Sequence, residues 1–217
     1  MIVVIGSNKG GPGKSTTSIN VAVGLALRGK SVCYFDADKQ KSGKDWHSYR
    51  VENGVKPEIT LVAETGNIAA SLLEMDAQHD YVIVDVAGRN SHEFVVAGSV
   101  ADLIIAPHLS SQLDMNTVDE LLSQHTAWLG INPEMKLYVY HSRSSNHPVV
   151  RKQERAEFLA FMSDYPELPV LKTVGFERKA FRDSIPLGLG VLELPAKKAT
   201  ADAKKDILAL LKEVFPE

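Results

Sequence analysis

The feature that most constrains this chain is a short apolar run followed closely by a glycine-rich loop that contains two lysines. Residues 2–5 read Ile-Val-Val-Ile, and residues 9–16 read Lys-Gly-Gly-Pro-Gly-Lys-Ser-Thr. A buried strand of this kind delivers the loop to the start of a helix, where unpaired N–H groups and the helix dipole favour an anion. Glycines lack a Cβ, so the backbone can approach phosphate oxygens closely. The pattern predicts a phosphate-binding loop.

The residues of this loop have distinct expected roles. Lys14 is expected to reach the β- and γ-phosphates of a nucleotide, and the Ser15 hydroxyl to bind Mg²⁺. The usual loop pattern has glycine where this chain has Asn8, and it does not require a lysine at position 9. The residues expected to contact the nucleotide are Lys9, Gly10, Gly11, Pro12, Gly13, Lys14, Ser15 and Thr16.

Apolar, β-branched runs alternate with longer amphipathic stretches, which predicts an α/β fold: a doubly wound, mostly parallel sheet flanked by helices. The runs are almost continuously apolar, as expected for strands covered on both faces. Because no linker or repeat is visible, residues 1–217 are expected to form one domain. The expected strands are 2–6, 31–36, 59–62, 81–85, 103–107, 137–141 and 170–174. The expected helices are 14–28, 42–52, 68–75, 91–100, 115–128, 149–163, 178–184 and 200–214.

Composition adds few constraints. The net charge of −3 gives no global positive field, although Lys and Arg exceed Asp and Glu by two from residue 143 onward. The single cysteine, Cys33, excludes an intramolecular disulfide framework and is expected to be a small core residue. The seven histidines have no metal-ligand spacing. No apolar stretch approaches the roughly 20 residues that span a bilayer, so a cytoplasmic location is expected.

Acidic residues follow two of the expected strands, at the edge where a doubly wound sheet binds its ligands. Asp85 closes the apolar run 81–84, which is typical of a Walker B strand, and is expected to hold Mg²⁺ directly or through water. Gly88 is expected to let the backbone face the γ-phosphate. Asp36 and Asp38 end another strand, and for Asp36 a structural role and a role in the site both stay open.

With Lys9 at its head, the loop resembles the deviant Walker A motif K-G-G-x-G-K-[ST] of the ParA/MinD group of P-loop ATPases. The stretch 35–40 resembles that family's D-x-D-P-Q motif, with Lys39 in place of the proline. The stretch 101–107 and the Leu113-Asp114 pair resemble a further strand and loop of the family. The likeness is strong to about Asp114, weaker beyond it, and closest to short ParA-type partition ATPases without an N-terminal DNA-binding extension.

The resemblance implies roles for individual residues. Lys9 would reach across a sandwich dimer to the partner's ATP, and Asp38 would position the attacking water and support the metal shell. The expected catalytic residues are therefore Lys9, Lys14 and Asp38, and the expected metal-binding residues are Ser15, Asp38 and Asp85. Asp114 would lie near the dimer face, although a helix N-cap explains it equally well. Adenine contacts are expected from residues 142–143 and 175–178, in particular Arg143 and Arg178.

The resemblance also implies a function: a Mg²⁺-dependent ATPase that dimerises on ATP, binds DNA non-specifically on the nucleoid, and is released by a ParB-like or cargo adaptor. Intrinsic hydrolysis is expected to be slow. Phosphate contacts made by Lys and Arg would supply the DNA affinity. The candidate DNA contacts are Arg151, Lys152, Arg155, Arg178, Lys179, Arg182, Lys197, Lys198, Lys204 and Lys205.

Two other functions stay open. A MinD-like ATPase would insert a basic amphipathic C-terminal helix into a membrane. Here residues 206–217 are amphipathic but contain acidic side chains, which favours packing against the sheet and makes a membrane partner the weaker expectation. A metabolic P-loop enzyme resembling dethiobiotin synthetase would need a small-molecule pocket. No set of polar residues names such a substrate, and Lys9 favours the dimeric switch.

Overall fold

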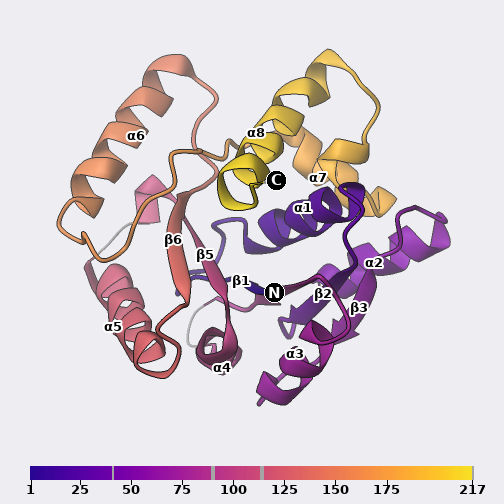
Figure 1. Ribbon diagram of the computed structural model, residues 1–217. Helices are drawn as coiled ribbons and strands as arrows, with labels where there is room; N and C mark the ends of the chain where they lie inside the picture. Colours follow the sequence, from indigo (N-terminus) through magenta and orange to yellow (C-terminus); the bar gives the residue numbers. More distant parts are fainter. Residues whose placement is uncertain (41, 89–90, 113–114, 217) are drawn as a thin grey trace.

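The computed structural model describes residues 1–40, 42–88, 91–112 and 115–216, in which a central sheet lies between two layers of helices (Figure 1). The strands follow the order β3-β2-β4-β1-β5-β6, and every pairing between them is parallel. This confirms the doubly wound fold. The strands are β1 (Ile2–Ile5), β2 (Val32–Ala37), β3 (Thr60–Ala63), β4 (Tyr81–Val86), β5 (Leu103–His108) and β6 (Lys136–His141).

Helices cover both faces of the sheet. One face carries α1, α2, α7 and α8, whereas α3, α4 and α5 cover the other and α6 lies beside β6 (Figure 1). The helices are α1 (Lys14–Leu27), α2 (Ser42–Glu52), α3 (Ala69–Asp76), α4 (His92–Val100), α5 (Met115–Ile131), α6 (Pro148–Met162), α7 (Lys179–Ser184) and α8 (Lys198–Val214). Short 3₁₀ turns are η1 (Ser110–Gln112), η2 (Ile185–Leu187) and η3 (Val191–Glu193).

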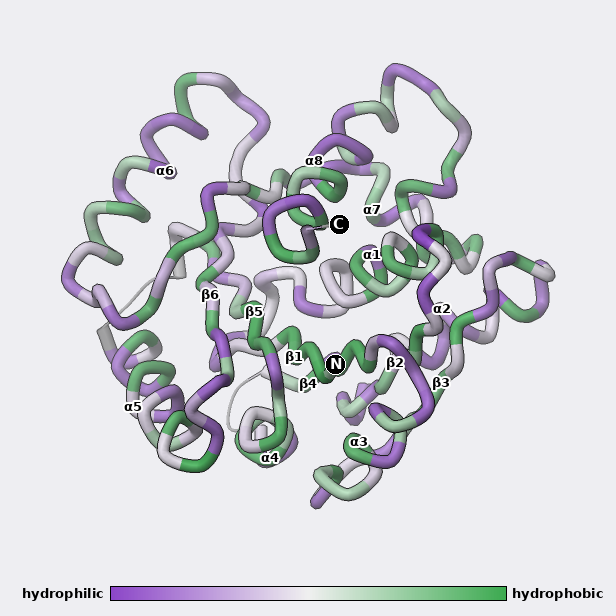
Figure 2. The backbone as a smooth tube through the Cα atoms, viewed as in Figure 1, coloured by the Kyte–Doolittle hydropathy of each residue, from purple (hydrophilic) through white to green (hydrophobic). Residues whose placement is uncertain are grey.

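The apolar strands form the centre of two hydrophobic clusters, one on each face (Figure 2). Side chains alternate between the faces: Val3 and Ile5 belong to the cluster under α1, and Ile2 and Val4 to the opposite one. All four residues of β1 are buried. Near-continuous apolar runs are therefore explained by burial on both sides. Cys33 is a buried core residue, as predicted.

The expected strand at 170–174 is wrong. Val170 makes only an isolated parallel bridge to Val139 of β6. The Leu171 amide still donates to the Val139 carbonyl at 2.9 Å, but the amides of Lys172 and Thr173 donate to the Glu213 carboxylate at 2.7 and 2.8 Å. A side chain from α8 thus takes the donors that a strand ladder would use, and β6 stays the last strand of the described sheet. The other expected strands and helices are confirmed, with shifts of three residues or fewer at their ends.

The C-terminal helix packs on the body of the protein. Ile207, Leu210 and Leu211 of α8 are buried against the α1 side of the sheet. Helix α1 approaches so closely that a Cβ on its Gly24 would lie 2.3 Å from Leu211 Cδ1. The apolar face of α8 is thus used inside the fold, as the sequence favoured. Within the described ranges, no helix is long and apolar enough to cross a membrane.

Helix α2 is tied to the C-terminal part of the chain by a buried ion pair. Arg50 is 2 % exposed, and its guanidinium donates to both carboxylate oxygens of Glu193 in η3 at 2.8 and 2.9 Å. The same group donates to the carbonyls of Pro57 and Gly188. A buried charge is tolerated when it is paired and hydrogen-bonded in this way. The pair fixes α2 relative to the segment that leads into α8.

Candidate nucleotide site

The glycine-rich loop and the predicted acidic residues meet at the carboxyl edge of the sheet. Ile5, the last residue of β1, is in register with Asp85 of β4, and Asp85 is in register with Asp36 of β2. The loop that follows β1 therefore starts beside Asp85, with Asp36 one strand further along the sheet. This edge of a parallel sheet is where ligands of doubly wound proteins bind.

The loop has the backbone shape of an anion cradle at the start of α1. Gly11 and Gly13 have φ values of 89° and 85°, in the left-handed region that glycine adopts without strain. Gly13 is the N-cap of α1 and provides no capping side chain, so the first amides of the helix face outward for an acceptor.

Lys14 crosses back over this loop. Its ammonium donates to the Lys9 carbonyl at 2.8 Å, and the residue is only 8 % exposed. Burial lowers the pKa of Lys14, while the charges of Asp85 and Asp38 act in the opposite direction. A desolvated ammonium that a backbone carbonyl holds beside the loop is well prepared to bind phosphate oxygens.

Gly88 packs directly against the head of the loop. A Cβ at this position would lie 2.8 Å from the Lys9 carbonyl oxygen and 3.1 Å from the Gly10 nitrogen. Only glycine fits without moving that backbone. The segment after β4 is therefore in contact with the residues that begin the phosphate loop.

Asp85 lies beneath α1 and is 1 % exposed. Its oxygens accept hydrogen bonds from the Tyr34 hydroxyl at 2.9 Å and the Ser18 hydroxyl at 3.3 Å, and the Ser15 side chain also bonds to it. Burial raises the pKa of Asp85 to about 7, with a further increase from the nearby charge of Asp36. These bonds oppose that rise. The carboxyl is placed to gain strongly from a cation.

The two aspartates after β2 have different surroundings. Asp36 is 2 % exposed and accepts the amides of Asp38 and Lys44 at 3.2 and 2.8 Å. It thus has a structural role, because it shapes the turn into α2. Asp38 is half-buried, and its side chain accepts the Gln40 amide at 2.9 Å.

The donors at this edge fit Mg²⁺. Ser15 and Asp85 offer hard oxygen ligands in contact with each other, next to the loop that would hold phosphates. Within the ranges that the structure describes, no cluster of three or more His, Cys, Asp or Glu could hold a metal by itself. Mg²⁺ in nucleotide sites commonly takes one or two protein ligands and fills the rest of its shell with phosphate and water.

A cavity of about 270 Å³ opens on the other side of the loop and contains both positions predicted for adenine contacts. The loop after β6 forms one wall: the Ser142 hydroxyl donates to the Pro12 carbonyl at 2.7 Å, and Arg143 Nη1 donates to the Gly11 carbonyl at 2.5 Å. Arg143 has a φ of 52°, rare for a side-chain-bearing residue. The lining residues are Pro12, Gly13, Thr16, Thr17, Tyr140, Ser142, Arg143, Gly175, Phe176, Glu177, Arg178, Phe181, Arg182 and Ile207.

Arg178 lies in this wall, but its guanidinium is bound within the fold. Its Nε donates to Asp206 of α8 at 2.5 Å, and its guanidinium carbon lies 5.2 Å from the centre of the Phe176 ring. Both predicted arginines therefore border the cavity, and both are hydrogen-bonded to other parts of the protein. Such bonded arginines are better suited to shape the pocket than to make polar contacts with a base.

The structure thus brings together the loop residues 9–16, Asp38, Asp85 and Gly88, with Arg143 and Arg178 on the adjoining cavity. Asp114 lies outside the described residues. Sequence reasoning missed two hydroxyl partners of Asp85, Tyr34 and Ser18. Their signals were present: Ser18 follows Lys14 by one helical turn, and Tyr34 lies on the same strand face as Asp36.

Comparison with known families agrees with this geometry. Residues 1–154 match the family model described as ATPase MipZ. The chain belongs to this family of ATPases. It is a ParA/MinD-type P-loop ATPase, as the loop motif predicted.

Several relatives of this ATPase have names that refer to partitioning or distribution. The maintenance of carboxysome distribution protein A of Halothiobacillus neapolitanus is 26% identical, and the match covers 99% of this chain and 96% of that protein. The chromosome-partitioning ATPase Soj of Thermus thermophilus is 25% identical, with 72% and 76% covered. Protein ParA of Rhizobium radiobacter is 35% identical over 52% of this chain and 50% of its own length.

Solved structures share the fold of this ATPase at lower identity. An ATP complex of McdA from Cyanothece superposes with a TM-score of 0.74 at 16% identity, covering 100% of this chain and 96% of that one. A cobyrinic acid a,c-diamide synthase from Mycobacterium smegmatis with bound ADP and magnesium gives 0.70 at 19%, with 97% and 94% covered. Among such structures, the McdA complex holds ATP, and the synthase is known with ADP and magnesium and with an ATP analogue and magnesium.

The contact at Gly88 yields a testable prediction. Gly88→Ala places a methyl group against the Lys9 carbonyl, and such overpacking costs about 1–3 kcal/mol, here through displacement of the loop head. Calorimetric titration with ADP should show weaker binding. Gly130→Ala in α5, where no atom lies within 4 Å of the added Cβ, is the matched control. Equal ADP affinity in both variants would contradict the packing argument.

The buried carboxyl yields a pH prediction. Because the pKa of Asp85 is about 7 in the folded protein and near 3.8 in a free side chain, the folded state holds the extra proton between these values. The stability that this proton provides is lost as the pH rises toward 7. In Mg²⁺-free buffer, Asp85→Asn should therefore gain about 2 kcal/mol of unfolding free energy relative to wild type between pH 5 and 7. Urea unfolding measures the difference, and a pH-independent difference would refute it.

Proposed function

We propose that this protein is a ParA-type positioning ATPase, one P-loop domain over residues 1–217, whose ATP-bound sandwich dimer binds DNA non-specifically in the cytoplasm. A ParB-like or cargo adaptor would stimulate hydrolysis and release the dimer. The cargo would be a plasmid, a chromosome or a protein assembly. Relatives named for chromosome partitioning and carboxysome distribution support this class of function.

The observation that carries the proposal is the second lysine at the head of the loop. Lys14 is the lysine expected to bind the phosphate held by its own chain, and its ammonium donates to the Lys9 carbonyl. The Lys9 backbone is held from two sides, by Lys14 and by the close approach of Gly88. The lysine at position 9 is explained if its ammonium contacts the phosphate that a second copy of this protein binds.

Chemistry at such a site is in-line attack of water on the γ-phosphate. Lys14 and the loop amides stabilise the charge that develops on the phosphate oxygens, and Asp38 orients the water. Mg²⁺, held by Ser15 and Asp85, adds charge neutralisation when bound. Because Lys9 acts only in the dimer, the monomer lacks one positive charge, so turnover is slow until dimerisation and adaptor contact.

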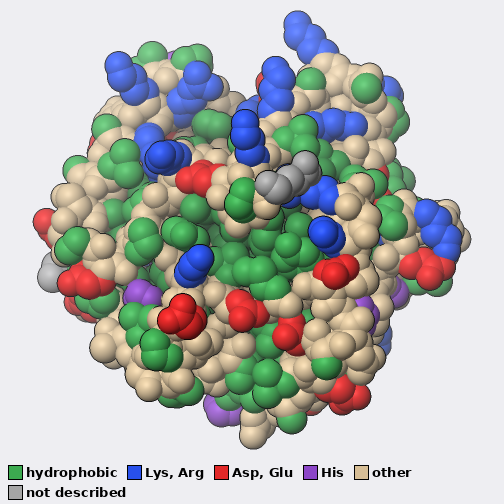
Figure 3. Space-filling view, in the orientation of Figure 1, with side chains coloured by type: hydrophobic (Ala, Val, Ile, Leu, Met, Phe, Trp, Pro, Cys, Tyr) green, Lys and Arg blue, Asp and Glu red, His purple; other side chains and the backbone are tan. Residues whose placement is uncertain are grey.

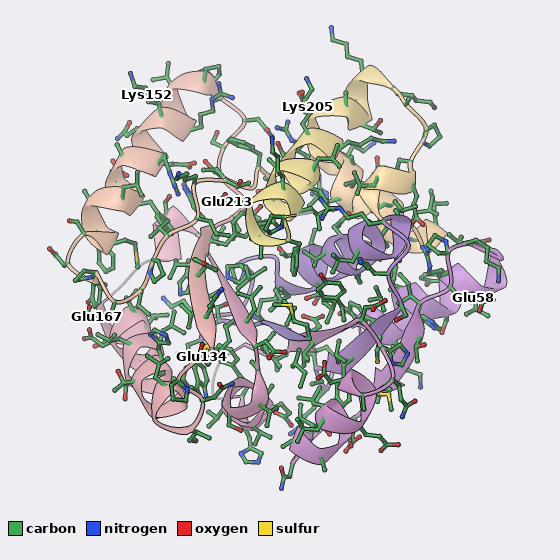
Figure 4. The ribbon with its side chains drawn as sticks, viewed as in Figure 1. Glu58, Glu134, Lys152, Glu167, Lys205 and Glu213 are labelled. Atoms are coloured by element: carbon green, nitrogen blue, oxygen red, sulfur yellow. The ribbon has the colours of Figure 1, made fainter. Side chains whose placement is uncertain are left out.

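The structure sorts the candidate DNA contacts into two groups. Arg155, Arg178 and Lys204 are hydrogen-bonded within the fold, to Leu171, Asp206 and two carbonyls of residues 192 and 194. Others are exposed, and Lys and Arg gather over α6 and α8 (Figure 3). Lys152 on α6 and Lys205 on α8 both lie at this outer surface (Figure 4). The exposed group comprises Arg151, Lys152, Lys179, Arg182, Lys197, Lys198 and Lys205.

The other two functions have less support. The apolar residues of α8 are buried against α1, so a MinD-like membrane insertion would have to undo that packing. A metabolic synthase shares the fold at 19% identity, which makes the fold itself uninformative between a switch and a metabolic enzyme. The lysine at position 9 favours the dimeric switch over the metabolic enzyme.

The dimer prediction is tested by sedimentation velocity with ADP and with ATP. Wild type should sediment as a dimer only with ATP, and Lys9→Ala should stay monomeric while still binding ATP, because Lys14 is intact. The exposed Lys30→Ala is the matched control and should dimerise normally. An ATP-dependent Lys9→Ala dimer would overturn the role of Lys9, and an unchanged monomer of wild type would overturn the proposed switch.

The DNA prediction uses charge reversal on the exposed group. Arg151→Glu with Lys152→Glu should weaken binding of the ATP dimer to random duplex DNA, and should lower the salt slope by about 0.9 per lost phosphate contact. Lys30→Glu with Lys136→Glu changes the net charge equally, at exposed positions that belong to neither α6 nor α8. Fluorescence anisotropy over a salt series separates the two, and equal losses would refute a localised DNA surface.

A further inference from the structure

A tyrosine in the sheet is bonded to the carboxylate expected to hold the metal. Tyr34 of β2 is 0 % exposed, and its hydroxyl donates to Asp85 Oδ2 at 2.9 Å. The weaker bond to Asp85 Oδ1 comes from Ser18 at 3.3 Å, and Ser18 also bonds the Lys14 carbonyl at 2.9 Å. Tyr34 is therefore the stronger of these two hydroxyl donors to the carboxylate.

The ring of Tyr34 is held firmly by the first turns of α2. A Cβ at Gly43 would lie 2.2 Å from Tyr34 Cε1, so the ring packs directly on the glycine backbone. On the same helix, the Trp46 ring lies 5.5 Å away between ring centroids, tilted by 51°. Because the ring packs against Gly43 and Trp46, α2 sets the direction in which the Tyr34 hydroxyl meets Asp85.

A buried hydroxyl is costly in an apolar sheet unless it is bonded. Phenylalanine would fill the same space against Gly43 and Trp46 without that cost. The bond also leaves Asp85 Oδ2 occupied, so that the orientation of the whole carboxylate is set before any ligand arrives. Groups that orient a metal-binding carboxylate in this manner tune its affinity for the ion.

We propose that Tyr34 is a positioning residue for Mg²⁺: its hydroxyl orients the Asp85 carboxylate, and the packing of its ring ties that orientation to α2. This rests on the proposed function only in taking Asp85 as a metal-holding residue. Since α2 begins just after the Asp36–Asp38 turn, whose Asp36 accepts the Lys44 amide, movement of that turn would reach the metal site through the Tyr34 ring.

The test measures metal binding without turnover. Mn²⁺ is titrated into the protein with saturating ADP and followed by electron paramagnetic resonance. Tyr34→Phe should weaken Mn²⁺ binding by roughly ten-fold, the lower end of the effect of losing such an orienting partner. Ser18→Ala should weaken it less, because its bond is longer and shared. Tyr138→Phe, a half-buried tyrosine of β6, is the matched control and should leave Mn²⁺ affinity unchanged.

The outcomes separate a positioning role from a structural one. If Tyr34→Phe lowers thermal stability but binds Mn²⁺ and ADP as wild type does, the hydroxyl is structural and the proposal fails. An effect of Ser18→Ala as large as that of Tyr34→Phe would also overturn it. If wild type itself binds no Mn²⁺ with ADP, the assignment of the metal site fails first, and with it the proposed ATPase mechanism.

Discussion

The rest of the site depends on one constraint: a carboxylate buried under the start of helix α1, beside a lysine that is almost as deeply buried. Asp85 is 1 % exposed and Lys14 is 8 % exposed, and each is perturbed in the direction that favours its neutral form. Burial disfavours both charges. A phosphate bound by Lys14 and a divalent cation bound by Asp85 would stabilise them, so this pair of buried groups suits a Mg²⁺-nucleotide.

The surrounding elements are arranged to keep that edge in place. The parallel register sets Asp36 beside Asp85, and Asp36 then fixes the turn into α2. Helix α2 is locked at its far end by the buried pair of Arg50 and Glu193. Gly88 and the loop after β6 clamp the phosphate loop from two other directions. The residues of the site are thus positioned by the sheet and by helices that buried contacts hold in place. Sites built on such rigid elements are precise.

Much of this was predictable because the signals are local. A strand, a glycine-rich turn and a helix start are encoded within residues 2–16, and Asp85 ends an apolar run of the right length. The expected strand at 170–174 failed for a non-local reason: Glu213, some forty residues away, takes the amides of Lys172 and Thr173. Arg143 and Arg178 both line the cavity beside the phosphate loop, but their bonds to Gly11 and Asp206 depend on contacts that no spacing rule describes.

The sequence by itself therefore determined the phosphate loop, the order of strands and helices along the chain, and the acidic residues at the carboxyl edge. These follow from periodicity, glycine conformations and short-range spacing. Only the tertiary structure decided that Asp36 shapes a turn while Asp85 faces the loop, that three candidate DNA-binding cations are used internally, and that the Tyr34 hydroxyl donates to the Asp85 carboxylate. Each of these depends on burial and on which distant side chain supplies the partner, and both are set by packing across the sheet.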